Sequence, residues 1–223
     1  MGHAGASGYI AALTLLGYSA VSIRPTALLL NVLVATIASW HFWRAGHFSW
    51  PLFWPFATLA VPMAFLGGYL PIPGRPVSVL VGVVLLASAV RFLWRPAPVA
   101  DLRPLKRPVA LAAGGGIGFL SGMTGTGGGI FLTPILLLCR WAPVRRVAGV
   151  TGPFILLNSL AGLAGYAASG WTVGSVLLPV ALAAIAGGAL GSYLGSDRLP
   201  VRAVQTLMAI VLVIAGVKLI FVT

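Results

Sequence analysis

A run of glycines and threonines, Gly122-Met-Thr-Gly-Thr-Gly-Gly-Gly129, interrupts an apolar stretch that extends from Pro108 to Leu138. Glycine adopts left-handed backbone conformations at little cost, so such a run opens a helix and leaves backbone N–H groups without partners. These N–H groups and the positive end of the following helix dipole would favour a bound anion. Close helix packing around small residues explains the same run without any ligand. The run is therefore predicted to be either a packing site or the floor of a binding site.

Polar side chains that could complete a binding site are few. Thr124 and Thr126 place hydroxyls inside the run, while Asn31 and Asn158 lie in the middle of otherwise apolar segments. A buried amide in lipid needs partners and is a functional-site hypothesis by default, although a hydrogen bond between helices explains it equally well. The neighbouring Ser159 is interpreted as a packing residue or a satisfied polar group. The candidate substrate-binding residues are Gly5, Ser7, Gly8, Asn31, Thr124, Thr126, Gly127, Gly128, Gly129 and Asn158.

Side chains for other kinds of chemistry are scarce. The chain has two carboxylates, Asp101 and Asp197, and one cysteine, Cys139. Neither carboxylate falls in a predicted membrane segment, whereas cation transporters and proton pumps usually need one there. An intramembrane enzyme would need a nucleophile and a base, or a set of metal ligands, in contact. We therefore predict no catalytic residue, no metal and no cofactor, and we expect transport of an anion rather than a reaction.

The composition is that of an integral membrane protein. The chain is 59% hydrophobic and 7% charged, and its mean hydropathy is +1.04, whereas soluble domains carry roughly 25% charged residues. The net charge of +12 would suggest nucleic acid as a partner of a soluble protein. Here it is assigned to basic loops of a membrane protein, and no nucleic acid is expected.

Six apolar segments of about 19–24 residues are each long enough to cross a hydrocarbon core about 30 Å thick. Three shorter segments, 5–19, 109–123 and 129–140, are interpreted as half-helices, and the glycine run joins the last two. The predicted fold is all-α, a polytopic transmembrane helical bundle in a single membrane domain that covers residues 1–223. The long segments cover residues 25–43, 50–71, 76–94, 145–168, 173–195 and 200–222.

The charges predict an orientation in the membrane. Most of the 14 Lys and Arg residues fall at one set of segment ends, and only Arg24, Arg75 and Lys218 fall at the other. Because basic residues collect in cytoplasmic loops, the first set is expected inside the cell and the C-terminus outside. The expected location is the cell inner membrane, with a cytoplasmic linker. Residues 109–140 then enter and leave on the same face, which favours a re-entrant hairpin over two full spans.

The two halves of the chain resemble each other when the residues are shifted by 124 positions. Gly46 then aligns with Gly170, and Leu66-Gly-Gly-Tyr-Leu70 aligns with Leu190-Gly-Ser-Tyr-Leu194. Since each half has an odd number of long helices, the halves are predicted to be inverted copies, with a site near the midplane between them. The first hairpin is expected to be shortened at its N-terminus, unless the chain starts upstream. The predicted parts are a first repeat at 1–94, a linker at 95–107 and a second repeat at 108–223.

Three motifs resemble the TauE/SafE sulfite-exporter family of permeases: Gly5-Ala-Ser-Gly-Tyr-Ile-Ala11, the glycine run continued to Leu136, and Val147-Ala-Gly-Val-Thr-Gly-Pro-Phe-Ile-Leu-Leu-Asn158. The resemblance covers nearly the whole chain and includes the duplication. It implies passage of small anions such as sulfite, sulfonates or related organic anions across the bacterial inner membrane.

The leading hypothesis is therefore a permease or exporter of a small anion with a site between the two repeats. The alternative is a membrane scaffold or subunit that transports nothing, which the shortened first hairpin would favour. The expected partners are the small anionic substrate and the lipid bilayer, and the sequence leaves open whether the chain forms a homo-oligomer.

Overall fold

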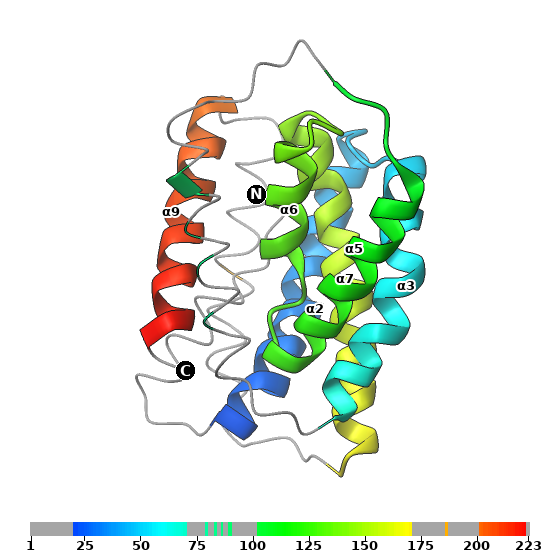
Figure 1. Ribbon diagram of the computed structural model, residues 1–223, viewed down its shortest axis with the longest axis vertical. Coiled ribbons are helices and arrows are strands. Elements are labelled where there is room, and N and C mark those ends of the chain that lie inside the picture. The colour runs from blue at the N-terminus through cyan, green and yellow to red at the C-terminus, as the bar shows by residue number, and fades with distance from the viewer. Residues whose placement is uncertain are drawn as a thin grey trace.

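The computed structural model describes residues 20–70, 102–170 and 201–221, together with residues 79, 83, 86, 89, 90 and 186. Side chains are described from residue 24 onward in the first helix and only in part in the last. Every regular element in these ranges is an α-helix, as predicted (Figure 1). The helices are α2 (Ala20–Arg44), α3 (Trp50–Tyr69), α5 (Arg107–Thr124), α6 (Gly129–Leu138), α7 (Val144–Ala168) and α9 (Val201–Phe221).

The boundaries of α2, α3, α7 and α9 agree with four of the predicted long segments to within a few residues. In the described part, three helices are long and apolar enough to cross a membrane, namely Arg24–Arg44, Trp50–Tyr69 and Val144–Ala168. The predicted segment 5–19 lies outside the described residues, and only single residues of 76–94 and 173–195 are described.

Local signals in the sequence explain where several helices begin and end. Pro51 stands in the first turn of α3, where its fixed φ fits the helix and its missing N–H is not needed. Gly46 has a φ of +71° after α2 and Gly170 a φ of +88° after α7. Arg140, with a φ of +56°, is in the same conformation after α6. There, the N–H of Trp141 donates to Leu136 O at 3.0 Å and that of Arg140 to Leu137 O at 3.1 Å, the pattern of a Schellman motif.

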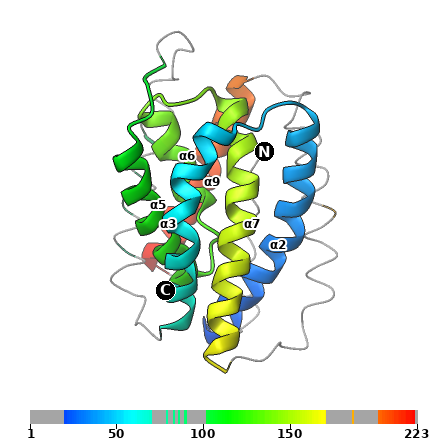
Figure 2. The same ribbon diagram turned by 90° about the vertical axis from the view of Figure 1, so that its right-hand side faces the viewer.

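The described helices pack around α7 and α3. Figure 2 shows α3 between α5 and α7, with α2 along the other side of α7. α2 and α7 run in opposite directions, because Gly152 lies against Ser39 while Gly162 lies against Leu28. Fully buried side chains fill the space between α3, α6 and α7, the largest being Phe56, Leu132, Leu136, Val147, Val150 and Phe154.

Backbone contacts join α5 to α3. Gly114, Gly118 and Gly122 recur every fourth residue on one face of α5. A Cβ on any of them would overlap a backbone carbonyl of α3, from Phe56, Ala60 and Ala64 respectively. Small residues let helices approach closely in a membrane, where lipid competes for apolar side chains. We refer to the face of α5 that carries these three glycines as the glycine seam.

α5 and α6 form a hairpin whose two outer ends meet, as the charge pattern predicts. The N–H of Arg103, just before α5, donates to the carbonyl of Arg140, just after α6, at 2.8 Å. The two arms are unequal. α5 has 18 residues and α6 has 10, or about 27 Å and 15 Å at 1.5 Å per residue. The expectation of two half-helices therefore fits α6 but not α5, which is nearly as long as a full span.

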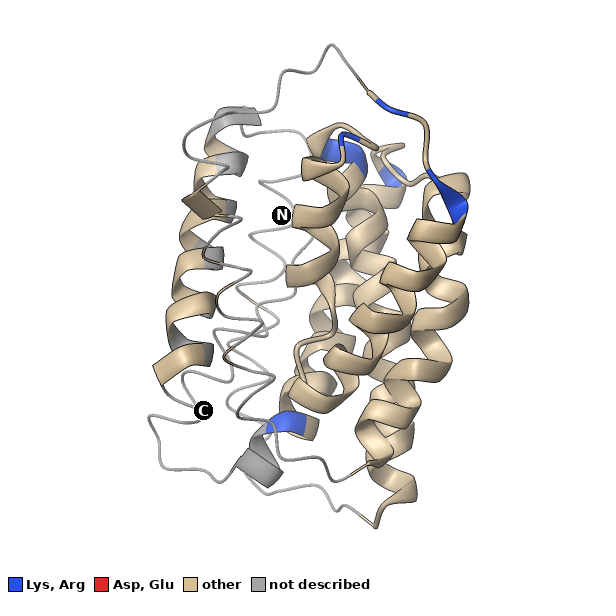
Figure 3. Ribbon diagram, viewed as in Figure 1, with Lys and Arg blue, Asp and Glu red and all other residues tan. Residues whose placement is uncertain are grey.

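Charge is separated along the bundle. Figure 3 shows the described Lys and Arg residues at the upper end of the ribbon, except at the lower end of α2, where Arg24 lies. The face of the membrane that each end meets remains a prediction. So does the inverted repeat, although the equivalent helices α2 and α7 have 25 residues each and run in opposite directions.

Candidate functional site

The glycine run places the N-terminus of α6 inside the bundle. Gly127 and Gly128 have φ values of +71° and +80°, a conformation that costs roughly 1–2 kcal/mol for a residue with a side chain. Figure 1 shows the connection from α5 rising back along the bundle before α6 begins. Gly128 caps α6, and its carbonyl accepts the N–H of Leu132 at 3.0 Å. Among the described residues, the N–H groups of Gly127 to Ile130 have no acceptor.

Asn31 and Ser159 lie directly against Gly127. A Cβ on this glycine would stand 2.9 Å from Asn31 Nδ2 and 3.0 Å from Ser159 Oγ. The amide of Asn31 also donates to the carbonyl of Gly125 across 3.4 Å. The chain thus brings one polar side chain from α2 and one from α7 to the turn that precedes α6.

Several buried polar atoms around this turn have no hydrogen-bond partner in the part of the chain that is described. They are Asn31 Oδ1, Ser121 Oγ, Asn158 Oδ1 and Ser159 Oγ, and each of these residues is no more than 1% exposed. Ser39 Oγ is also unpartnered, but this residue of α2 lies against Gly152 of α7, away from the turn. Buried polar groups are nearly always hydrogen-bonded, so a group of exceptions in one place is an unusual feature that needs an explanation.

Asn158 lies on the face of α7 that is turned toward the hairpin. Its Nδ2 donates to the carbonyl of Phe154 one turn earlier, at 2.9 Å. Phe154 lies against Gly128. A Cβ on Gly162, one turn after Asn158, would stand 3.5 Å from the Cα of Gly122. Asn158 is therefore placed between the two halves of the broken helix.

Thr124 and Thr126 contact each other rather than a free space. Their hydroxyl oxygens are 2.9 Å apart, and Thr124 also donates to the carbonyl of Leu120 at 2.7 Å. Because Thr124 uses its proton on Leu120, Thr126 donates to Thr124. Both protons are then engaged, so these hydroxyls hold the turn and have none left to donate to an anion in this arrangement.

The packing role that was predicted for the glycine run is found at some of its residues, and others form the turn. Gly122 packs against α3, and Gly129 packs against Ile155 of α7. Gly125, Gly127 and Gly128 have the positive φ values that the turn requires. On the side where a Cβ would project from Gly127 or Gly128, protein side chains already lie, so a ligand would reach the backbone from the side of its N–H groups.

The structure brings Asn31 together with the predicted site residues of the second half of the chain. Gly5, Ser7 and Gly8 lie outside the described residues. Ser121 is not among the predicted site residues, and Ser159 is predicted to be a packing residue or a satisfied polar group, yet both hydroxyls are buried and unpartnered next to the glycine run. The position of Ser159 beside Asn158 on one helix was the available signal. Within the described ranges, no group of three or more His, Cys, Asp or Glu side chains could hold a metal ion.

Comparison with known proteins shows what kind of protein carries this arrangement. The family description "Sulfite exporter TauE/SafE" matches residues 1–219. The chain belongs to this family. The match extends over both halves and over the glycine run, so the TauE/SafE chain is a multi-pass membrane protein of a transporter family.

Two relatives are consistent with this assignment. A probable membrane transporter protein of Sinorhizobium fredii is 39% identical over 227 residues, which cover 99% of this TauE/SafE chain and 92% of the relative. A probable membrane transporter protein of Methanocaldococcus jannaschii is 39% identical over 70 residues, or 29% of this chain and 26% of the relative. No solved structure matches the chain significantly.

Proposed function

We propose that this protein moves a small anion, such as sulfite, a sulfonate or a related organic anion, outward across the bacterial inner membrane. The observation that carries the proposal is the N-terminus of α6, which begins inside the bundle beside the unpartnered hydroxyls of Ser121 and Ser159. The family match and the printed names of the two relatives support a membrane transporter.

The chemistry of the site favours an anion over a cation. Backbone N–H groups and serine hydroxyls can donate to a negatively charged oxygen, and so can the second N–H of each asparagine amide, whereas the asparagine Oδ1 atoms only accept. A cation would need carboxylates or clustered carbonyls, and no Asp or Glu is present among the described residues. The helix dipole adds partial positive charge at the same position.

The lack of a partner for a buried hydroxyl is explained if this hydroxyl binds the substrate. Leaving a buried donor without a partner costs about 1–3 kcal/mol, and a bound oxyanion would remove that cost each time it entered the site. Outward movement would need no further energy source for a monoanion, since a membrane potential of 100 mV, inside negative, contributes about 2.3 kcal/mol per charge.

Ser159→Ala is the most informative substitution, because a binding role and a structural role predict different changes in KM and in the unfolding temperature. If the hydroxyl serves the substrate, the KM for sulfite should rise about 10-fold, since a hydrogen bond to a charged group contributes about 1.5–3 kcal/mol. The same change should leave the unfolding temperature unchanged or raise it, because it removes a buried group without a partner. Efflux of radiolabelled sulfite and methanesulfonate from proteoliposomes measures the first effect.

Ser169→Ala is the matched control, because Ser169 is exposed at the end of α7 and donates to the carbonyl of Tyr166. It should change neither KM nor turnover. Two stronger variants, Gly128→Leu and Asn158→Leu, should abolish flux. Folded variants of this pair that transport at the wild-type rate would show that the site is wrongly placed. Wild-type vesicles that release no anion would instead favour the scaffold.

A further inference from the structure

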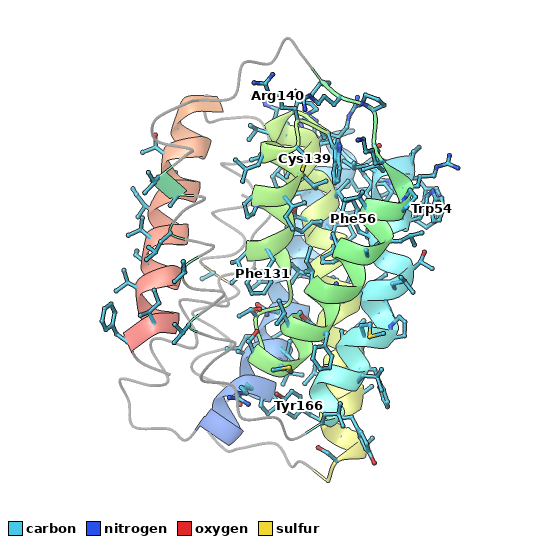
Figure 4. All side chains as sticks on the ribbon, viewed as in Figure 1. Trp54, Phe56, Phe131, Cys139, Arg140 and Tyr166 are labelled. Atoms are coloured by element: carbon cyan, nitrogen blue, oxygen red, sulfur yellow. The ribbon has the colours of Figure 1, made fainter. Side chains whose placement is uncertain are left out.

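Arg24 and Tyr166 lie beside the turn at which the broken helix opens. The backbone of Arg24 contacts that of Gly125, so closely that a Cβ on the glycine would stand 2.6 Å from the carbonyl oxygen of Arg24. The Tyr166 hydroxyl donates to the carbonyl of Met123 at 3.4 Å and is also hydrogen-bonded to the side chain of Arg24. Figure 4 shows Tyr166 near the lower end of the bundle, far from Arg140 and Cys139 at the other end.

The positive charge of Arg24 has no acidic partner in the described ranges. These ranges contain no Asp or Glu, and the whole chain has only two. Arg24 is partly buried, and the other described basic residues lie at the opposite end of the bundle (Figure 3). An uncompensated guanidinium in a region of reduced dielectric attracts anions more strongly than an exposed one would.

The guanidinium also has donors to spare. Arginine presents five N–H groups in a planar fork that matches two oxygens of one oxyanion. The interaction with the Tyr166 hydroxyl leaves most of these donors for another partner. Lysine would supply the charge without the fork.

We propose that Arg24, held by Tyr166, binds the oxyanion at the end of the bundle opposite the other described basic residues and makes that end selective for oxyanions. The proposal rests on the proposed function, because it assumes that an anion passes the start of α6. Sulfite and alkyl sulfonates have two or more oxygens for the fork, whereas chloride has none. The site would therefore discriminate between anions of equal charge.

The test measures the dependence of flux on sulfite concentration when sulfite is supplied on the side of Arg24. Arg24→Gln should raise KM about 10-fold or more with turnover within about twofold of wild type, because it removes charge-assisted hydrogen bonds. Arg24→Lys should give an intermediate KM and should reduce the preference for sulfite over chloride. In the wild type, KM should rise with ionic strength, and this dependence should weaken in Arg24→Gln.

Arg44→Gln is the control, because it removes the same charge from the opposite end, where Arg44 is exposed and lies over the ring of Trp40. It should leave KM unchanged. A wild-type KM in Arg24→Gln would overturn the proposal, as would equal losses of turnover and thermal stability. If Arg24→Gln does not fold, Arg24→Lys decides, since a wild-type KM and wild-type anion preference in that variant also overturn it. A normal KM in Arg24→Gln combined with a raised KM in Ser159→Ala rejects the role of Arg24 and leaves the proposed function intact.

Discussion

At the scale of single residues, the glycines of the run are required for different reasons. Gly125, Gly127 and Gly128 have positive φ values, whereas Gly122 and Gly129 have no room for a side chain. Gly125 and Gly127 combine both constraints. At Gly127, Ile155 Cγ2 and Asn31 Nδ2 lie 2.8 Å and 2.9 Å from the position of the missing Cβ. The turn before α6 is therefore fixed by the residue type at each position and by the helices that surround it.

Two glycines with the same φ should therefore differ in how much substitution by alanine lowers the free energy of unfolding. Gly127→Ala should lower the free energy of unfolding by the conformational cost of about 1–2 kcal/mol and by a further ~1–3 kcal/mol for overpacking. Gly46→Ala should show only the conformational cost, because Gly46 also has a φ of +71° but nothing lies within 4 Å of its missing Cβ. Chemical unfolding in detergent measures both variants. Equal losses would mean that Ile155 and Asn31 move aside freely and do not define the turn.

At the scale of helices, contact between backbones holds α5 in place. The glycine seam packs Gly114, Gly118 and Gly122 against carbonyls of α3. Between helices in lipid there is little hydrophobic driving force, so close packing must supply the stability. A rigid α5 matters for the site because Ser121 and the glycine turn are at its C-terminal end.

Substitutions in the seam should therefore act differently from substitutions elsewhere on the same helix. Gly118→Ala should destabilise the protein by about 1–3 kcal/mol, because the new Cβ overlaps the backbone carbonyl of Ala60, which cannot rotate away. Gly116→Ala should be neutral or stabilising by about 0.5–1 kcal/mol, because nothing lies within 4 Å of that position and alanine favours a helix. Thermal denaturation compares the two. A stable Gly118→Ala protein would contradict the close approach of α3 and α5.

At the scale of the whole molecule, the two ends of the bundle differ in charge. The ends of the hairpin meet at the basic end, as Arg103 and Arg140 show, while the turn after α7 is at the other end, near Tyr166 (Figure 4). If the basic end is cytoplasmic, an anion leaving the cell would pass the start of α6 before it reached Arg24.

The single cysteine allows a direct test of this orientation. Cys139 follows α6 at the basic end and is partly exposed. A membrane-impermeant maleimide should label it in inverted vesicles but not in intact spheroplasts. In the variant with Cys139→Ala and Ser169→Cys, labelling should occur in spheroplasts instead. Labelling of Cys139 from outside the cell would reverse the orientation.

The pH of the labelling experiment matters. Burial raises the pKa of the Cys139 thiol above its ordinary value, and the positive charge of Arg103 offsets this only in part. Maleimides react with the thiolate, whose population at a given pH falls as the pKa rises. Labelling should therefore be slow at neutral pH and accelerate at mildly alkaline pH. A rate that does not change with pH would mean that another step limits the reaction.

The sequence by itself determined the local features of this protein. Hydropathy located α2, α3, α7 and α9 to within a few residues, because a membrane span needs a long apolar segment whatever surrounds it. Glycine marked the break between α5 and α6, since few other residues adopt a positive φ cheaply. The motifs were specific enough to indicate the family.

Only the tertiary structure decided which side chains meet at that break. Asn31 and Gly125 are 94 residues apart in the chain, and their contact depends on how α2, α7 and the hairpin pack. The same packing leaves Ser121 and Ser159 without partners and places Arg24 beside Gly125. Hydrogen-bond satisfaction depends on distances between helices, and no local pattern in a sequence specifies those distances.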